Sequence, residues 1–121
     1  MEQKRATGRA GERIAARYLE ELGYRIVETN YRCALGEIDI IAEAAGELVF
    51  VEVRSRRSGR AGLPEESIGS RKGDRLRRLA EAYLQAHPDR PYRCRLDVVA
   101  VDVTPSGSGE RVEHILNAIT W

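Results

Sequence analysis

Apolar and polar residues alternate along two neighbouring segments of the chain, and this pattern predicts a β-hairpin. Residues 36–42 and 48–54 are rich in Ile and Val, and the apolar side chains recur at every second position. Between them lies Ala45-Gly46, a pair that is typical of a tight turn. We therefore expect the two segments to run antiparallel and to pair through backbone hydrogen bonds.

If Ala45-Gly46 is the centre of the turn, the pairing brings two carboxylates together. Asp39 then lies directly opposite Glu52, and Glu37 lies opposite Arg54. Directly opposed residues have Cβ atoms roughly 4.5–5.5 Å apart, and like charges at that distance destabilise a sheet. A divalent cation bound by oxygen ligands is the usual partner that offsets such a repulsion.

The alternation also divides the side chains of the hairpin between two faces. The apolar face, which we expect to pack inward, consists of Ile38, Ile40, Val49, Val51 and Val53. The opposite face combines the charged residues with Ile41 and Phe50. A face of mixed apolar and acidic character favours a partly covered cleft. The alternative interpretation is a solvated polar face on an amphipathic hairpin.

Two further segments carry apolar residues at the spacing of an α-helix. The first covers residues 8–22 and ends at Gly23, because glycine favours the conformation that closes a helix. The second covers residues 70–86 and ends before His87-Pro88, because a residue that precedes proline disfavours the helical conformation. Both helices have one apolar stripe, so we expect each of them to cover a sheet.

Alternation and β-branched residues predict three more strands, over residues 24–32, 92–103 and 111–116. A loop rich in Gly, Ser and Arg covers residues 55–68. The resulting order, α-β-β-β-α-β-β, indicates an α/β fold in which helices pack on a sheet in two or three layers. A chain of 121 residues suffices for one ordinary domain, so we expect residues 1–121 to form a single domain.

The basic residues are concentrated in one part of the chain, although the net charge is only +1. Nine basic residues and three acidic residues lie between Arg54 and Arg78. We expect six residues of this basic segment to contact the phosphates of a nucleic acid: Arg56, Arg57, Arg60, Arg71, Lys72 and Arg75. The preference for Arg over Lys suits bidentate phosphate contacts, and a GC-rich genome explains it equally well.

Several classes of protein and site are disfavoured by the sequence. The apolar runs have only the length of strands, and no signal peptide is recognisable, so we expect a cytoplasmic protein without a membrane partner. Cys33 and Cys94 are isolated, which argues against a zinc site. His114 has no visible partner and is interpreted as a packing or surface residue. Asp97 is either a further acid of the site or a buried structural residue paired with an arginine.

The two hairpin segments, Gly36-Glu37-Ile38-Asp39-Ile40-Ile41-Ala42 and Val49-Phe50-Val51-Glu52-Val53-Arg54, resemble the signature of PD-(D/E)xK nucleases. More closely, the chain resembles the YraN family of small uncharacterised bacterial proteins, which are similar to archaeal Holliday-junction resolvases. Three stretches carry this likeness: Gly8-Arg9-Ala10-Gly11-Glu12, Asn30-Tyr31-Arg32 and Arg95-Leu96-Asp97-Val98-Val99. The resemblance implies a restriction-endonuclease-like core, α-β-β-β-α-β, with a mixed sheet flanked by helices.

The resemblance also implies roles for individual residues. Glu12, Asp39 and Glu52 match acids that bind Mg²⁺ or Mn²⁺ in such nucleases, and Asp39 and Glu52 are the central pair. Arg54 stands where these nucleases usually have a lysine, and an arginine cannot act as a base at ordinary pH. It can still stabilise the charge of a phosphoryl transition state. Lys72 is either the replacement for the missing ammonium group or an ordinary solvated lysine.

Three functions therefore compete at the level of sequence. The first is a metal-dependent endonuclease that acts on DNA, with branched or bent DNA as the preferred substrate and a homodimer as the implied assembly. The second is a non-catalytic nucleic-acid-binding module built on a nuclease scaffold, an alternative that Arg54 favours. The third is a protein-interaction domain whose basic segment meets an acidic partner.

Overall fold

The helices and strands follow one another in the order that the sequence predicts. The computed structural model describes residues 2–57, 70–90, 93–106 and 109–119, and for residues 2–6, 70–72 and 109–110 it describes the backbone alone. In chain order the elements are α1 (Glu2–Glu21), β1 (Arg25–Cys33), β2 (Gly36–Ala44), β3 (Glu47–Arg57), α2 (Ser70–Ala86), β4 (Cys94–Val103) and β5 (Gly109–Ile119).

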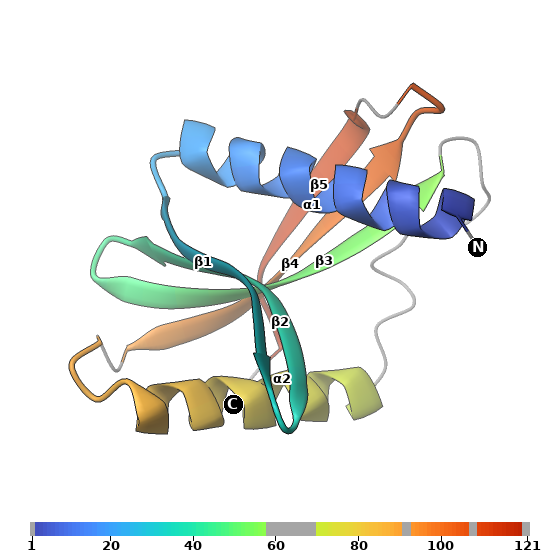
Figure 1. The fold of residues 1–121 in the computed structure, drawn as a ribbon. Helices are drawn as coiled ribbons and strands as arrows, with labels where there is room; N and C mark the ends of the chain where they lie inside the picture. Colours follow the sequence, from blue (N-terminus) through green and yellow to red (C-terminus); the bar gives the residue numbers. More distant parts are fainter. Residues whose placement is uncertain (1, 58–69, 91–92, 107–108, 120–121) are drawn as a thin grey trace.

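The strands form one mixed sheet in the order β1-β2-β3-β4-β5. Neighbouring strands are antiparallel, except that β3 and β4 are parallel. A parallel pair requires a long crossover connection, and α2 lies in the connection between these two strands. Figure 1 shows α1 on one face of the sheet and α2 on the other, so the fold has three layers. The predicted mixed α/β sheet flanked by helices is therefore confirmed.

The two helices have the character that their sequences predict, with one difference in length. The second predicted helix, residues 70–86, is confirmed at both ends. The first begins at Glu2, six residues before the predicted start at residue 8, and ends before Gly23, whose φ is +96°. Neither helix in the described part of the chain combines the length and apolar character that crossing a bilayer requires.

Both faces of the sheet are buried, whereas the alternation predicts one inward face. The core under α1 contains Ile40, Val49 and Val51, together with apolar residues of β4. The core under α2 contains Ile41 and Phe50, which are fully buried. These two residues therefore belong to a second core, because a helix covers that face as well.

The prediction that Ile38 shares a face with Ile40 is wrong. Ile38 belongs to the core under α2, whereas Ile40 belongs to the core under α1. Strict alternation would place both side chains on one face. The tip of the β1–β2 hairpin lies against α2, since a Cβ placed on Gly36 would come within 3.8 Å of Leu79 (Figure 1). At this end of β2, Ile38 packs with the residues of α2.

The β2–β3 hairpin has the predicted turn and register over part of its length. Ala45 and Gly46 form the turn, and both have positive φ, as a two-residue hairpin loop of this kind requires. Pairing runs from Ala44 with Glu47 to Ile40 with Val51 and ends there. The predicted pair of Asp39 with Glu52 and the predicted pair of Glu37 with Arg54 are therefore not formed.

Candidate functional site

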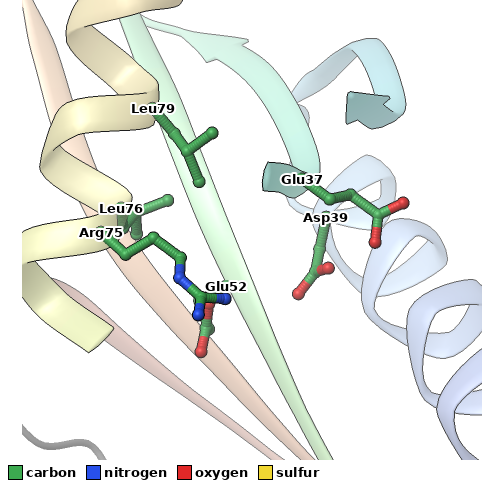
Figure 2. Close-up of a pocket in the computed structure, with 6 residues that line it drawn as sticks. All are labelled: Glu37, Asp39, Glu52, Arg75, Leu76 and Leu79. Atoms are coloured by element: carbon green, nitrogen blue, oxygen red, sulfur yellow. The ribbon is translucent and has the colours of Figure 1, made fainter. Parts of the chain in front are cut away.

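The cleft at the end of the β2–β3 pairing collects most of the predicted acids. Its volume is about 260 Å³, and its lining consists of Glu37, Asp39, Glu52, Arg75, Leu76 and Leu79. Figure 2 shows the acids projecting from β2 and β3, whereas α2 contributes the arginine and the two leucines. Pockets that enclose a small molecule usually measure about 300–1,000 Å³. This cleft is smaller, and its size suits one charged group of a larger ligand.

Asp39 lies in the cleft where β3 separates from β2. Its Oδ2 accepts a hydrogen bond from the backbone N–H of Val53 at 2.8 Å, so a side chain replaces the backbone carbonyl that regular pairing would provide. Burial raises the pKa of Asp39 to about 7; the bond from Val53 opposes this rise, and the carboxylates of Glu52, Glu12 and Glu37 add to it. Negative charge at this position is therefore in excess.

Glu52 lines the cleft from β3 and has a cationic neighbour on its own strand. Arg54 Nη1 lies 3.3 Å from Glu52 Oε2, and both side chains are largely buried. Two residues further along, Arg56 pairs with Asp102 of β4 at 2.8 Å. The structure thus places Arg54 beside an acid of the site, but Arg54 is not part of the cleft lining.

Glu12 reaches the neighbourhood of the cleft from α1 without lining it. Its Oε1 accepts a hydrogen bond from Asn30 Nδ2 at 3.1 Å. Asn30 has a φ of +53° and lies between Thr29 and Tyr31, whose partners on β2 flank Asp39. Glu12 is therefore close enough to raise the pKa of Asp39 but lies outside the group of residues that line the cleft.

The chemistry of the cleft suits a hard divalent cation. Within the described residues, no three His, Cys, Asp or Glu side chains lie close enough to hold a metal ion together. Mg²⁺, however, usually keeps several waters and binds through one or two carboxylates plus phosphate oxygens of the substrate. Oδ1 of Asp39 has no hydrogen-bond donor in the part of the chain that the structure describes. Asp39 and Glu52 can therefore provide the protein ligands of such an ion.

Arg75 is the cation that lines the cleft. Its side chain extends from α2 into the space that it shares with the acids (Figure 2), and its stem passes within 3.9 Å of the position of a Cβ on Gly36. Among the described residues it has no ion-pair partner. A guanidinium in this position can bind a phosphate next to the acidic pair. The sequence predicts Arg75 as a general nucleic-acid contact and not as a member of the acidic site.

Of the other predicted basic contacts, the structure describes the side chains of Arg56 and Arg57, and neither lines the cleft. Arg56 is engaged with Asp102, and Arg57 is exposed at the end of β3. Arg60 lies outside the described residues. Arg71 and Lys72 belong to the first turn of α2, and their side chains also lie outside the description. The proposed role of Lys72 as a replacement ammonium group therefore stays a prediction.

A second polar cluster lies under α1 and is much better satisfied. Asp97 is fully buried; its Oδ1 accepts hydrogen bonds from Arg95 Nε at 2.9 Å and from the backbone N–H of Asn117 at 2.8 Å. Its Oδ2 lies 3.0 Å from Arg95 Nη2 and 2.7 Å from His114 Nε2. Burial opposes ionisation of Asp97, but hydrogen bonds from His114, Arg95 and Asn117 outweigh it, so its pKa is lowered.

This arrangement decides between the two interpretations of Asp97. The residue is a buried acid paired with an arginine, and its partner His114 contacts Tyr18 of α1, on the other side of the sheet from α2 (Figure 1). His114 has a partner after all, and its side chain is only 4% exposed. The sequence gives no signal for this pair, because the register between β4 and β5 shifts between Leu96 and Val98. Asn30 is also missed as a neighbour of the site, although it opens one of the stretches that carry the family likeness.

Comparisons with known proteins agree over nearly the whole chain. The sequence model described as "Uncharacterised protein family UPF0102" matches residues 11–101. A "UPF0102 protein" of Syntrophus aciditrophicus is 50% identical over 118 residues, covering 98% of this chain and 91% of that relative. One of Desulforamulus reducens is 48% identical over 120 residues, covering 97% and 98%. One of Moorella thermoacetica is 53% identical over 98 residues, covering 81% and 82%.

The predicted likeness to a small uncharacterised bacterial family is therefore confirmed. None of these names states an activity or a ligand. The nuclease resemblance thus stays a prediction, and its support must come from the chemistry of the cleft.

Proposed function

Since the chain belongs to the uncharacterised protein family UPF0102, we propose its function from the chemistry of the cleft: cation-dependent hydrolysis of phosphodiester bonds in nucleic acid. The observation that supports this most directly is the convergence of Asp39, Glu52 and Glu37 in one cleft with the guanidinium of Arg75. Burial raises the pKa of Asp39 to about 7, and the nearby carboxylates of Glu52, Glu12 and Glu37 add to the rise, so a cation bound here would stabilise the ionised acid. Perturbed acids in a cleft are typical of functional sites.

Each residue of the cleft has a definite task in this proposal. Asp39 and Glu52 hold a Mg²⁺ or Mn²⁺ ion, which when bound supplies an activated water and offsets the charge of the phosphate. The N–H of Val53 fixes the orientation of the Asp39 carboxylate. Arg75 binds the phosphate from the opposite wall of the cleft, and Arg54 neutralises part of the charge of Glu52.

DNA is the proposed nucleic acid, in keeping with the resemblance to resolvases. The phosphate contacts of a cleft of this kind do not read base sequence, so we expect the shape of the DNA to decide the preference. Symmetric cutting of two strands requires two sites related by a two-fold axis, and the proposal therefore includes a homodimer.

One observation favours a second candidate, a nucleic-acid-binding module without catalysis. In the described part of the chain the acids do not form a complete set of three ligands. The nuclease resemblance adds that Arg54 stands where such enzymes usually have a lysine. This candidate keeps the DNA contact and predicts no cleavage in the presence of any divalent cation.

Cleavage of labelled four-way junction, flap and single-stranded DNA with Mg²⁺ or Mn²⁺ tests the proposal. We expect Asp39→Asn, Glu52→Gln and Arg75→Gln each to lower the rate by about 100-fold or more, the scale expected for a group that stabilises charge in the transition state. The matched controls Asp89→Asn and Glu81→Gln change exposed acids outside the cleft and should leave the rate unchanged.

The outcomes separate the candidates. Cleavage that disappears in the three cleft variants and persists in the controls supports the proposal. Binding of DNA without cleavage at any divalent cation overturns it in favour of the binding module. Cleavage that survives Asp39→Asn and Glu52→Gln places the activity outside the cleft and overturns it as well.

A further inference from the structure

Three arginines form a row along the solvent-facing side of α1. Arg9, Arg13 and Arg17 are spaced four residues apart, and all three are exposed. Residues four apart lie on the same face of an α-helix, and each interval corresponds to a rise of about 6 Å. This set, which we call the arginine row, therefore extends over about 12 Å of the helix surface.

The arginine row has no ionic partner within the part of the chain that the structure describes. The acid nearest in sequence, Glu12, accepts a hydrogen bond from Asn30 on the side of the helix that faces the cleft. Like charges four residues apart destabilise a helix by a few tenths of a kcal/mol for each pair. The Arg9–Arg13 and Arg13–Arg17 spacings are thus unfavourable, and no ion pair in the described chain offsets them.

The order of charges along α1 also opposes the helix dipole. Negative side chains stabilise the N-terminal end of a helix and positive side chains stabilise the C-terminal end. In α1 the last turn contains Glu20 and Glu21 and no basic residue, and of the arginine row only Arg17 lies directly before that turn. Arg9 and Arg13 therefore gain little from the helix dipole, and we look for the explanation of the row in a partner.

We infer that the arginine row binds the phosphate backbone of duplex nucleic acid, as a second contact surface beside the cleft. A guanidinium can donate two parallel hydrogen bonds to a phosphate, and evenly spaced guanidiniums suit a partner whose charge repeats evenly. The choice of nucleic acid as the partner rests on the proposed function, whereas the existence of an unpaired basic surface does not.

An acidic protein is the other class of partner, and the composition of the surface disfavours it. Protein interfaces have an apolar or aromatic centre surrounded by a polar rim. Among the described residues, the large apolar side chains that are exposed are Leu22, Leu35 and Leu116, and none of them lies within α1. A surface that offers guanidiniums without an apolar centre fits a phosphate backbone better.

The position of the row indicates a duplex and not a single strand. Glu12 lies between Arg9 and Arg13 in the sequence and is close enough to Asp39 to raise its pKa, so the row lies near the cleft without lining it. Arg75 lies on α2, across the sheet from α1 (Figure 1). A nucleic acid that contacts both therefore presents backbone at two separate places, as the two strands of a duplex do.

Binding of a fluorescently labelled DNA duplex, measured by anisotropy in EDTA over a range of salt concentrations, tests this inference. The triple variant Arg9→Gln, Arg13→Gln, Arg17→Gln is compared with a charge-matched triple variant, Arg25→Gln, Arg90→Gln, Arg93→Gln. The control positions lie at the start of β1 and in the α2–β4 connection, outside α1 and the cleft.

We expect the arginine-row variant to bind DNA at least about tenfold more weakly than the wild type at about 0.1 M salt. The slope of the logarithm of the binding constant against the logarithm of the salt concentration should also be less steep by about 2–3, because each phosphate contact contributes about 0.9 to it. The control variant should stay within about twofold of the wild type. Equal slopes for the two variants would overturn the inference, and so would a wild type that binds no duplex at low salt, which would leave an acidic protein as the partner.

This measurement is independent of cleavage, because EDTA removes divalent cations. Duplex binding that depends on the arginine row supports the inference even if the protein cuts no DNA, an outcome that would overturn only the proposed hydrolysis. Conversely, cation-dependent cleavage together with equal slopes for the two variants would overturn the arginine row and leave the hydrolysis standing.

Discussion

Asp39 and Asp97 occupy similar positions in the backbone and opposite electrostatic surroundings. Each of them lies where the pairing between two strands is interrupted. Each accepts a hydrogen bond at 2.8 Å from a backbone N–H of the neighbouring strand, which belongs to Val53 in one case and to Asn117 in the other. The fold thus uses one local device twice, once in the cleft and once under α1.

The two acids differ in the charge of their other neighbours. Asp97 also receives hydrogen bonds from Arg95 and His114, and its pKa is lowered in spite of complete burial. Asp39 has no cationic partner in the described chain, and burial together with nearby carboxylates raises its pKa to about 7. A carboxylate that the fold has satisfied serves stability, whereas one that the fold has left short of positive charge is prepared for a ligand.

The largest effect in this comparison is expected from removing the satisfied acid. In Asp97→Ala, Arg95 and His114 lose their common acceptor in a buried site, which typically costs about 3–5 kcal/mol. The free energy of unfolding, measured in urea at pH 7, should fall by that amount. The exposed Asp89→Ala serves as control and should change it by less than about 0.5 kcal/mol.

The loss should depend on pH in a direction that follows from the lowered pKa of Asp97. Its contribution is present above the ordinary pKa of 3.8 and is lost as the pH falls below that value through the pKa of the folded state. The difference between wild type and Asp97→Ala should therefore shrink below about pH 4. A difference under about 1 kcal/mol at pH 7 would contradict the structural role of this cluster.

Removing the unsatisfied acid should have the opposite sign. Asp39→Asn keeps an oxygen for the N–H of Val53 and abolishes the charge. The pKa of Asp39 rises from 3.8 in the unfolded chain to about 7 in the folded protein. When the acid is ionised in both states, this rise lowers the free energy of unfolding by about 4 kcal/mol. We expect Asp39→Asn to raise the free energy of unfolding at pH 8 by about 1–3 kcal/mol in EDTA, because the amide retains part of the cost of burial.

The sign of the pH dependence provides the check. The raised pKa means that the folded state of the wild type loses stability as the pH rises from 3.8 through about 7. The advantage of Asp39→Asn should therefore be greatest at pH 8 and decrease toward pH 4. The exposed Asp89→Asn should show no such trend. Equal or lower stability of Asp39→Asn at pH 8 would show that the cleft is not short of positive charge.

The contrast between the two acids could be predicted from the sequence only in part. Local signals were sufficient for the helix over 70–86, the Ala45-Gly46 turn and the hairpin that carries Asp39 and Glu52. These features depend on alternation, turn chemistry and helical spacing, which a short segment contains in full. The sequence therefore predicts the acids that line the cleft but not their arrangement.

What the sequence could not provide depends on contacts between distant elements. The β2–β3 pairing ends before Asp39, and the tip of the β1–β2 hairpin lies against α2; the alternation of side chains carries no record of either feature. Arg75 enters the cleft through the position of α2 on the sheet. The pair of Asp97 and His114 depends on a register shift in β4–β5, and a strand pattern does not reveal such a shift.

The smallest effect is expected at the margin of the satisfied cluster and shows how far its influence extends. Tyr24 accepts a hydrogen bond from Arg95 Nη2 at 2.7 Å, and Arg95 is also held by Asp97 and by Glu47. Tyr24→Phe should lower the free energy of unfolding at pH 7 by about 1 kcal/mol, since one bond to a partly accessible cation is lost. The matched Tyr31→Phe, whose hydroxyl has no hydrogen bond among the described residues, should change it by less than about 0.5 kcal/mol. A loss in Tyr24→Phe as large as that in Asp97→Ala would mean that the cluster is held from its edge, and that Arg95 rather than Asp97 is the residue to compare with Asp39.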